Sequence, residues 1–420
     1  MNNQKGYVVL IVTFFIMIIM LSVALTMSSQ IAFEQKTATS AVKSTQSYYA
    51  AESGIEDALL ILRRNPQLYS ASGVINYTLN VNGATAYVAI PNINPGGTRA
   101  ITSQGNNKSM VRSIQTVYAM DKQGISFYYG VHVGAGGLSM GNSSSIQGNV
   151  FSGGNITGSG TITGNAIVSG DNYIKDITVS GNVSAYNCLS NAHVGGNLIY
   201  FQGQTPTCQV TGTKTAQSSA IPDQDLPISS NQITTWETGL TECDSATVTL
   251  LSGNTKTASL GPCKISGSLT LGNTTTLIVT GTIYVTGNIT LGNTDTIKLD
   301  SSYGSLGGVI IADGTISIGN TATLSGSCVP SCVQSSSYLL LLSTNSSSSA
   351  INVGNTLTAT GAVLYTNTGG VNIGNTASVR EVTGYKVTLG NTFTLQYESG
   401  LADASFTSGP SGSWKVTSWT

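Results

Sequence analysis

Few residues in this sequence have the types and spacing that catalysis requires. The stretch Gly137-Leu-Ser139-Met-Gly141 matches the pattern of a serine hydrolase, in which a strained turn between a strand and a helix exposes the serine. That reaction also needs a histidine partner, and the chain has only His132 and His193. The pattern lies in a glycine-rich stretch with no helix expected behind it. We therefore interpret it as a chance match.

The acidic residues of the second half do not suggest a pair that cleaves glycans. Glycosidases place two carboxyl groups on either side of the bond that breaks. Here the acids show no common spacing and no fixed basic partner, and we interpret Arg380-Glu381 as a surface ion pair. We predict that the chain is not an enzyme. The acids considered are Asp171, Asp176, Asp295, Asp300, Asp313 and Glu381.

Metal-ligand patterns are equally sparse, and we expect no metal and no cofactor. Asp223-Gln-Asp225 lacks the further oxygen ligands of a calcium site. Cys328 and Cys332 lack the second pair or the histidines of a zinc site. The six cysteines suit disulfides in an oxidising compartment, although the sequence does not determine their connectivity and reduced thiols remain an alternative. Pairing along the chain would give Cys188–Cys208, Cys243–Cys263 and Cys328–Cys332.

The first element that we expect to position the rest of the chain is an apolar helix. Residues 6–33 carry no charge between Lys5 and Glu34, and this run is longer than the roughly 20 residues that span a bilayer. With one cation before it, we expect a single pass through the cytoplasmic membrane with the N-terminus inside. A cleaved secretory signal, which would have a shorter apolar region, and an uncleaved anchor are the alternatives.

The helical pattern continues beyond Glu34. Apolar residues recur near helical spacing as far as Leu62, and Asn65-Pro66 supplies a stop. This predicts one helix from Tyr7 to Arg64, within a helical region 7–66, whose second half is amphipathic and lies on a small sheet. The predicted stripe comprises Ala38, Val42, Tyr48 or Tyr49, Ile55, Leu59 and Leu62.

Two motifs in this segment resemble the N-terminus of type IV pilins, most closely the PilX-like minor pilins. One is Lys5-Gly6 followed by Tyr7 and the apolar run. The other, near the end of the helix, is Ala51-Glu52-Ser53-Gly54. The resemblance implies a leader peptide of residues 1–6, which a prepilin peptidase removes before it methylates Tyr7. It also implies that the helix then leaves the membrane and packs against other pilins in a surface filament.

The chain departs from this family at one position. Major pilins carry a glutamate at the fifth mature residue, where this sequence has Ile11. The resemblance implies that such a glutamate pairs with the N-terminal amine of a neighbouring subunit, because an unpaired buried charge is costly. A chain with Ile11 cannot form that pair, which fits a minor pilin at a filament tip.

Residues 67–123 are expected to form a small antiparallel sheet against the helix. Strand-like alternation covers 74–81 and 84–90, joined by the turn signal Asn82-Gly83, and 110–118 is a third candidate. Three or four strands would complete an α+β module. We expect the cations of this region to lie at solvated loops and edges: Arg99, Lys108 and Arg112.

From about Gly124 the sequence becomes repetitive. An apolar residue followed by Gly-Asn-Thr recurs at intervals near 20 residues, which predicts an all-β parallel β-helix that resembles bactofilin-like or adhesin-like solenoids. One or two β-sandwiches are the alternative. Gly and Asn tolerate left-handed backbone and can turn corners, where stacked Asn side chains can form hydrogen-bonded ladders. The predicted corner residues are Asn273, Asn293, Asn320, Asn355, Asn375 and Asn391.

We divide the repetitive part into a first solenoid segment, 124–200, an insertion, 201–245, and a second segment, 246–420. Prolines break the strand pattern in the insertion, and 231–237 could form a short helix. Trp414 and Trp419 are expected to cap the last coil.

Charged residues make up 8% of the chain and the net charge is -1, which excludes the basic footprint of a nucleic-acid-binding protein. We predict a non-enzymatic pilin-like subunit of the cell surface that displays a β-solenoid for adhesion or at a filament tip, with a surface or glycan ligand. The alternatives are a surface-anchored glycan-active or glycan-binding β-helix, tested at Asp300 and Asp313, and a polymerising surface scaffold.

Overall fold

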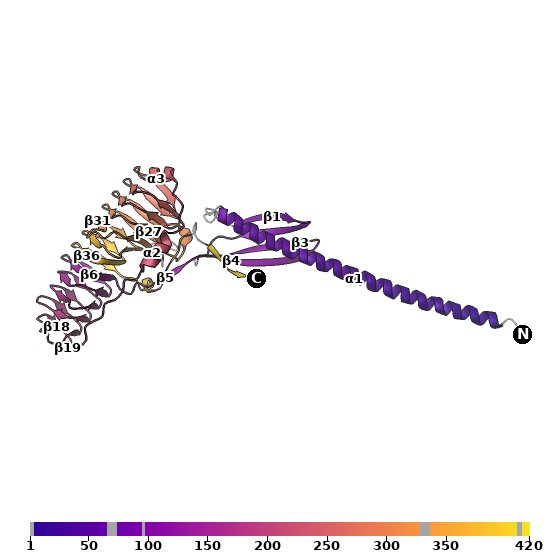
Figure 1. The fold of residues 1–420 in the computed structure, drawn as a ribbon, viewed down its shortest axis with the longest axis horizontal. Coiled ribbons are helices and arrows are strands. Elements are labelled where there is room, and N and C mark those ends of the chain that lie inside the picture. Colours follow the sequence, from indigo (N-terminus) through magenta and orange to yellow (C-terminus); the bar gives the residue numbers. More distant parts are fainter. Residues whose placement is uncertain (1–3, 65–73, 95–96, 328–336, 410–413) are drawn as a thin grey trace.

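The computed structural model describes residues 4–64, 74–94, 97–327, 337–409 and 414–420. It has two parts, which we call the stem and the rod (Figure 1). The stem is a long helix on a small antiparallel sheet, and the rod is a parallel β-helix that lies across the direction of that helix. The fold class predicted from the sequence is confirmed.

Helix α1 (Gln4–Arg64) is a single 61-residue helix with two different halves. Its apolar first half projects alone, whereas its second half packs on the sheet (Figure 1). The packed stripe is made of small side chains with Ile55 and Leu62 among them. The predicted stripe also included Tyr48 or Tyr49. Both side chains point away from the sheet and are 44% and 58% exposed. The buried helix residues are Ser47, Ala50, Ala51, Gly54, Ile55, Ala58 and Leu62.

The stem sheet has five strands in the order β1-β2-β3-β4-β39. Asn82 and Gly83 both adopt positive φ, 47° and 79°, in the predicted tight turn between β1 and β2. Strand β3 was not predicted, because polar residues dominate it. The bounds are β1 Ile75–Val81, β2 Ala84–Ile90, β3 Thr98–Asn107, β4 Met110–Met120 and β39 Trp414–Trp419.

The C-terminal strand corrects the predicted cap of the solenoid. Strand β39 pairs antiparallel with β4, so that Trp414 lies opposite Met120 and Trp419 opposite Thr116. The physical reason is that β4 would otherwise leave an open edge, which the returning chain pairs. The whole rod is therefore inserted between two adjacent strands of the stem sheet.

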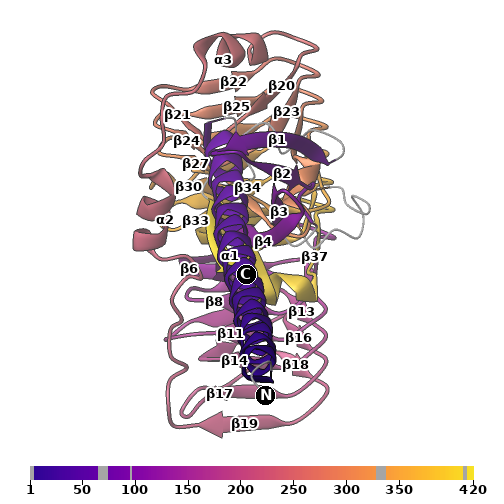
Figure 2. The same cartoon turned by 90° about the vertical axis from the view of Figure 1, so that its right-hand side faces the viewer.

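The first half of the rod starts at the middle and winds to one end (Figure 2). Each coil adds short parallel strands next to those of the previous coil. Its strands are β6 Val131–Met140, β7 Ser145–Gln147, β8 Val150–Ser152, β9 Ile156–Gly158, β10 Thr161–Ile162, β11 Ala166–Val168, β12 Tyr173–Lys175, β13 Thr178–Val179, β14 Val183–Ala185, β15 Asn187–Cys188, β16 His193–Val194, β17 Leu198–Phe201, β18 Gln209–Val210 and β19 Lys214–Gln217.

The predicted insertion at 201–245 is in fact a crossover between the two ends of the rod. Strands β18 and β19 still belong to the rod, so the segment outside it starts after Gln217. It carries α2 (Ser230–Glu237), the short helix that the sequence suggested, capped by Ser229. It then reaches the opposite end of the rod at α3 (Ser245–Leu251), as Figure 1 shows.

The second half winds from α3 back to the middle. Its strands are β20 Thr257–Leu260, β21 Cys263–Ile265, β22 Leu269–Leu271, β23 Thr276–Val279, β24 Ile283–Val285, β25 Ile289–Leu291, β26 Thr296–Leu299, β27 Gly308–Ala312, β28 Ile316–Ile318, β29 Thr323–Ser325, β30 Leu339–Ser343, β31 Ile351–Val353, β32 Thr358–Ala359, β33 Ala362–Thr366, β34 Gly370–Ile373, β35 Ser378–Val379, β36 Glu381–Leu389 and β37 Thr394–Gln396. A 3-10 turn, η2 (Ser301–Tyr303), lies between β26 and β27.

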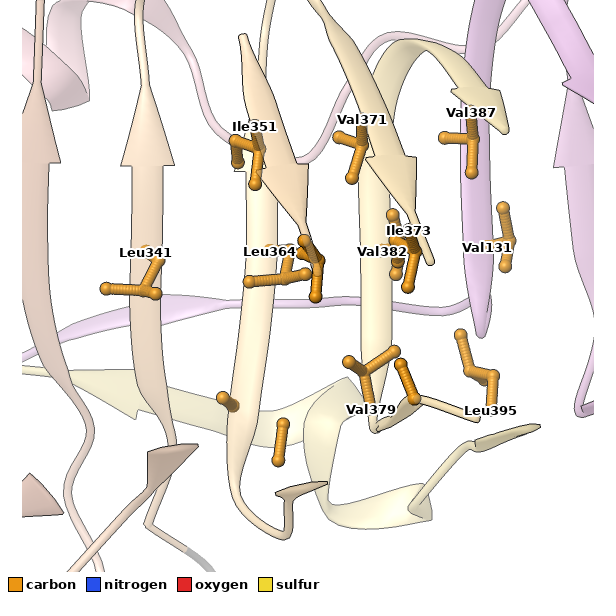
Figure 3. Packing of buried hydrophobic residues seen from close by; sticks show 14 of the residues in the cluster. Val131, Leu341, Ile351, Leu364, Val371, Ile373, Val379, Val382, Val387 and Leu395 are labelled. Carbon is orange, nitrogen blue, oxygen red and sulfur yellow. The ribbon is translucent and has the colours of Figure 1, made fainter. Parts of the chain in front are cut away.

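The two halves meet at a seam in the middle of the rod. Strand β36 pairs with β6, and β37 pairs with β7, both in parallel. The inward-facing residues Leu341, Leu364, Val382 and Val131 follow one another across this seam as register partners (Figure 3). Two segments far apart in the sequence therefore share one continuous core.

The central strands β27, β30 and β33 are buried on both faces, which explains their unbroken apolar sequences. Their inner residues join the core of the rod. Their outer residues, such as Leu340 and Tyr365, pack under the crossover helix with Ile233 and Trp236. We call the junction between rod and stem the neck. It consists of β5 Gln123–Ile125, η3 Ser399–Asp403 and β38 Ala404–Phe406, together with Arg99, Tyr118 and Trp414 at the adjoining end of the stem sheet.

Candidate functional site

The projecting half of α1 is the largest exposed apolar surface of the described residues. The span from Tyr7 to Phe33 contains no charged residue, and its large side chains are 37–71% exposed. A helix satisfies its own backbone hydrogen bonds, so this segment fits a bilayer or a bundle of similar helices. By length and hydropathy it is one candidate membrane span among the described residues.

The residues of the predicted processing site lie at the start of this helix. The helix begins at Gln4 and runs without interruption through Lys5, Gly6 and Tyr7. Tyr7 is 69% exposed, and Ile11 is 37% exposed one turn further on. Ile11 offers no carboxylate to a neighbouring chain.

The motif near the end of the helix has a packing role in the stem. Ala51 and Gly54 face the sheet, while Glu52 and Ser53 are half-buried at the side. A Cβ at Gly54 would lie 2.3 Å from Ser103 Oγ, so only glycine allows this approach. Two of the four motif residues, Ala51 and Gly54, therefore let the helix lie close to β3.

The hydrolase-like pattern has no elbow geometry. Ser139 lies inside β6, where its register partners are Thr388 and Thr157, and the element that follows is β7. A nucleophile elbow requires a turn into a helix. His132, on the same strand, is 7% exposed and packs edge-on against Tyr129 and Phe151.

The structure brings two carboxylates together at the outer face of the rod. Tyr284 donates a hydrogen bond of 2.6 Å to Asp313. Burial, followed by the charge of Asp313, raises the pKa of Glu237, which lies at the end of the crossover helix. Lys264 lies over the Tyr284 ring at 5.7 Å. Asp300 is elsewhere, where it caps η2 by accepting from the Ser302 backbone at 2.9 Å.

Arg380 and Glu381 do not form the surface ion pair that we expected. Arg380 pairs with Glu398, with Nε 2.9 Å from the carboxylate. Glu381 is fully buried at the seam, because the first four residues of β36 are covered on both faces of the strand. One Glu381 oxygen accepts from the Thr383 hydroxyl at 2.5 Å, and burial raises the pKa of this carboxyl well above its ordinary value.

The cysteine pairs lie at the two ends of the rod. Cys188–Cys208 joins the last two coils of the first half, and Cys243–Cys263 joins the end of the crossover to the first coil of the second half. Cys328 and Cys332 lie outside the described residues. Asp223 accepts from the Ser169 hydroxyl at 2.7 Å. Among the described residues, no cluster of three His, Cys, Asp or Glu is placed to hold a metal.

The corner asparagines form one column along the rod. Each side-chain oxygen accepts the backbone N–H of the asparagine in the next coil, at 2.7–3.0 Å. The column starts one coil earlier than predicted, at Asn254, and crosses the seam from Asn391 to Asn142. A second column in the first half runs through Asn149, Asn165, Asn182 and Asn197.

The threonines at these corners were missed by sequence reasoning. The left-handed residue is neither the glycine nor the asparagine but the threonine that follows them. The glycines are needed for a different reason, since a Cβ at Gly292 would lie 2.7 Å from Asn273 Oδ1 of the previous coil. The Thr-x-Thr spacing after each Gly-Asn was the sequence signal that could have identified these threonines as corner residues. The left-handed threonines are Thr255, Thr274, Thr294, Thr321, Thr356, Thr376 and Thr392.

Comparisons with known proteins give no family. No family model matches the chain, and no curated protein matches it. Among solved structures, the chain is similar to the competence-associated pilin ComZ from Thermus thermophilus, with a TM-score of 0.26 and 10% identity over 90% of this chain and 97% of that chain. A TM-score this low does not establish a common fold.

The neck that joins rod and stem contains a buried cation. Arg99 is 2% exposed, which corrects its predicted place at a solvated edge. Its guanidinium carbon lies 5.4 Å from the centre of the Trp414 ring, and Trp414 stacks on Tyr118 at 5.1 Å. Burial lowers the pKa of Arg99 to about 10. The returning strand is thus held at the point where it leaves the rod.

Proposed function

We propose that this chain is a non-enzymatic type IV pilin-like subunit that holds a β-helical rod outside the cell. The observation that carries the proposal is the two-part helix α1, exposed and uncharged from Tyr7 to Phe33 and packed on an antiparallel sheet from Ser47 onward. In such a helix, one half serves as a membrane anchor or filament core, and the other half serves as the spine of a folded domain.

The proposed partners follow from the exposed half of the helix. An apolar surface of this length is stable only in lipid or against other apolar helices. We propose that the chain sits in the cytoplasmic membrane with its N-terminus inside, is cut after Gly6 by a prepilin peptidase, and then packs against other pilins. The PilX-like resemblance of the Lys5-Gly6 and Ala51–Gly54 segments supports this sequence of events.

The shape of the rod supports a place at the filament tip. The rod is joined to the stem near its middle and extends to both sides of the helix direction (Figure 1). Shaft subunits must pack side by side, and a crosswise head hinders that packing. Ile11 supports the same place, because a subunit without a carboxylate there needs no amine from a neighbour. We propose that the rod serves adhesion from this position.

N-terminal sequencing of the mature chain tests the proposal. Co-expression with a prepilin peptidase should give a chain that starts at Tyr7 with a methylated amine. The variant Gly6→Val should remain uncut, while Gly124→Ala should be processed normally, since a Cβ at Gly124 has open space around it. A mature chain that starts at Met1, or beyond Phe33, would falsify the pilin assignment.

A glycan-active protein is the second candidate, favoured by the carboxylates of Asp313 and Glu237 beside Tyr284. Turnover of neutral polysaccharides by the full chain, abolished in Asp313→Asn and retained in Asp171→Asn, would establish it. Asp300→Asn should have no specific effect on turnover because Asp300 caps a 3-10 turn. Absence of turnover on every polysaccharide tried counts against this candidate.

A further inference from the structure

One face of the rod carries a regular array of hydroxyl groups. Directly after each corner asparagine, the sequence Thr-x-Thr or Thr-x-Ser recurs in successive coils of the second half. The first threonine is exposed and the second hydroxyl residue is again on the outside, while the residue between them is buried in every coil after the first. The array comprises Thr255/Thr257, Thr274/Thr276, Thr294/Thr296, Thr321/Thr323, Thr356/Thr358, Thr376/Ser378 and Thr392/Thr394.

Strand pairing holds the second column of this array in register. Thr276 pairs with Thr257 and Thr296, and the same pairing continues coil by coil. It also crosses the seam, where Thr394 pairs with Ser145 and Ser145 with Thr161. Neighbouring strands lie about 4.8 Å apart, so the hydroxyls repeat at that interval along the rod. We call these two columns the threonine face.

The array is rigid before any ligand arrives. The middle residues of the triplets, such as Ala322, Leu357 and Phe393, are buried in the core beneath it. The asparagine column runs beside the first threonines and ties each coil to the next. A surface that is already ordered loses little conformational entropy on binding.

The chemistry of the face is uniform. From Thr255 to Thr394 its two columns hold only threonine and serine. Each threonine carries one hydroxyl, which can donate and accept, and one methyl group. The hydroxyls of Thr356 and Thr392 already donate to the backbone oxygens of Asn355 and Asn391, so towards a ligand they act as acceptors. The first coil is the exception to this uniformity, because the exposed Lys256 lies between Thr255 and Thr257; Lys298 lies beside the third coil. A face that bound glycans would offer aromatic rings on which sugars stack, and the two columns contain none.

We propose that the threonine face binds ice. An ice surface is itself a rigid lattice of water oxygens, each of which donates and accepts hydrogen bonds. A periodic row of hydroxyls can order water in the pattern of that lattice, while the methyl groups between them displace poorly held water. Charged groups would hold water in their own geometry instead, which is why an uncharged array suits this ligand. The inference goes beyond the pilin-like role, since the face exists whether or not the chain assembles.

Ice partition of the full chain in lipid nanodiscs tests the proposal. Fluorescently labelled nanodiscs are mixed with a slowly growing ice crystal, and the label in the ice is divided by the label in the liquid. We expect enrichment in the ice for the loaded discs and exclusion for empty discs. The double variant Thr276→Lys/Thr296→Lys should lower the ratio about tenfold, which corresponds to about 1.4 kcal/mol.

The matched control uses the same two coils. Thr270→Lys/Thr290→Lys places the same charges on the neighbouring face, where Thr270 and Thr290 are likewise register partners. This variant should enter ice like the unchanged chain. Exclusion of the unchanged chain from ice overturns the proposal, and so does an equal loss in both variants. Binding to a neutral glycan array that only Thr276→Lys/Thr296→Lys removes, without entry into ice, would overturn it in favour of a glycan face. None of these outcomes depends on where the mature chain begins.

Discussion

Glu381 shows how a single residue at the seam can set the pH dependence of the rod. Its carboxyl is fully buried and one oxygen has a hydroxyl donor. Burial of a carboxyl penalises its charged form, so the pKa in the folded chain lies well above the ordinary 4.5. The unfolded chain releases this proton at the ordinary value. Stability is therefore full below that pH and declines as the pH rises toward the folded value.

Glu381→Gln should remove this decline. Glutamine keeps the oxygen that accepts from Thr383 and cannot ionise, so the seam stays neutral at every pH. We expect the melting temperature of the unchanged chain to fall by a few degrees between pH 5 and pH 8, and that of the variant to change less. Thermal unfolding followed by circular dichroism measures this. Glu56→Gln, at an exposed helix position, is the control, and an equal pH response in both variants would contradict the prediction.

At the corners, the residue types were predictable and their conformations were not. The recurrence of Gly-Asn-Thr predicted stacked corners, and the Asn columns lie at them. The sequence favoured Gly and Asn as left-handed residues because both adopt positive φ easily. In the structure Thr274 takes that conformation with φ 61°, although it is β-branched. A glycine is selected both where two coils approach closely and where the backbone is left-handed. A single sequence therefore does not show which of the two reasons applies at a given glycine.

The contact between α1 and β3 depends on two glycines. Gly54 on the helix faces the sheet, and Gly105 on β3 faces the helix. A Cβ at Gly105 would lie 1.8 Å from the Ser47 carbonyl oxygen and 2.8 Å from the Ala51 nitrogen. Backbone atoms of a helix cannot move aside as a side chain can. The stem is thus held at its closest point by Gly54 on the helix and Gly105 on the sheet.

Gly105→Ala should lift the helix from the sheet. Overpacking of this kind costs about 1–3 kcal/mol, so we expect faster amide exchange in 47–58 and earlier unfolding of the stem. Hydrogen exchange of the full chain in nanodiscs measures both. Gly124→Ala provides the comparison because a Cβ there has open space. Unchanged exchange in 47–58 would show that the stem tolerates the added methyl group.

The disulfides protect the ends of the rod, where a coil has a neighbour on one side only. Cys188–Cys208 fixes the coil of β18, and Cys243–Cys263 fixes the coil of β21; each spans a sequence separation of 20. Terminal units of a stacked repeat are the least stable because they lack one interface. Both bridges are therefore placed where they restrict fraying most.

Cys188→Ser/Cys208→Ser should fray one end without opening the seam. Loss of a bridge of this loop length costs about 3 kcal/mol. We expect faster hydrogen exchange in β18 and β19, with exchange in β6 and β36 unchanged. The double variant Cys243→Ser/Cys263→Ser should do the same to β21 at the other end. Equal acceleration in the seam strands would mean that the rod unfolds as one unit.

Several elements were predictable because their signals are local. The apolar run predicted α1, and Asn82-Gly83 predicted the first hairpin. The path of the rod was not predictable from the sequence, because no residue indicates on which side of the previous coil the next coil stacks. The return of β39 to the stem was hidden for the same reason: Trp414 and Trp419 look equally suited to a cap. Pairing between strands so distant in the sequence is decided by tertiary contacts alone.

At the scale of the whole molecule, the return crossover gives the rod two different ends. Helix α3 covers the end at β20, with Leu251 buried against the core. The other end finishes with β18 and β19, which carry no such helix (Figure 1). Head-to-tail stacking of rods would require both ends to be open. A polymerising scaffold is therefore the least supported of the three functions considered.

The neck should connect rod and stem as one body through Trp414. Its ring stacks on Tyr118 and lies under the buried guanidinium of Arg99. Trp414→Ala removes both contacts and leaves the buried charge of Arg99 without its ring. Because Trp414 is partly buried, we expect a cost below the roughly 3–5 kcal/mol of a fully buried tryptophan. We expect β39 to detach from β4, so that one strand in place of two connects the rod to the stem.

Hydrogen exchange and limited proteolysis of the full chain distinguish this detachment from general unfolding. In Trp414→Ala, amides of β39 and the facing residues of β4 should exchange faster, and protease should cut near β39 first. The rod strands should keep their protection, because the stem sheet reaches the rod core at one end alone, through Met120 and the partly buried Trp414. Trp419→Ala, which changes a 40% exposed ring on the same strand, should have little effect. Equal effects of the two variants, or loss of protection throughout the rod, would show that Trp414 does not hold the neck.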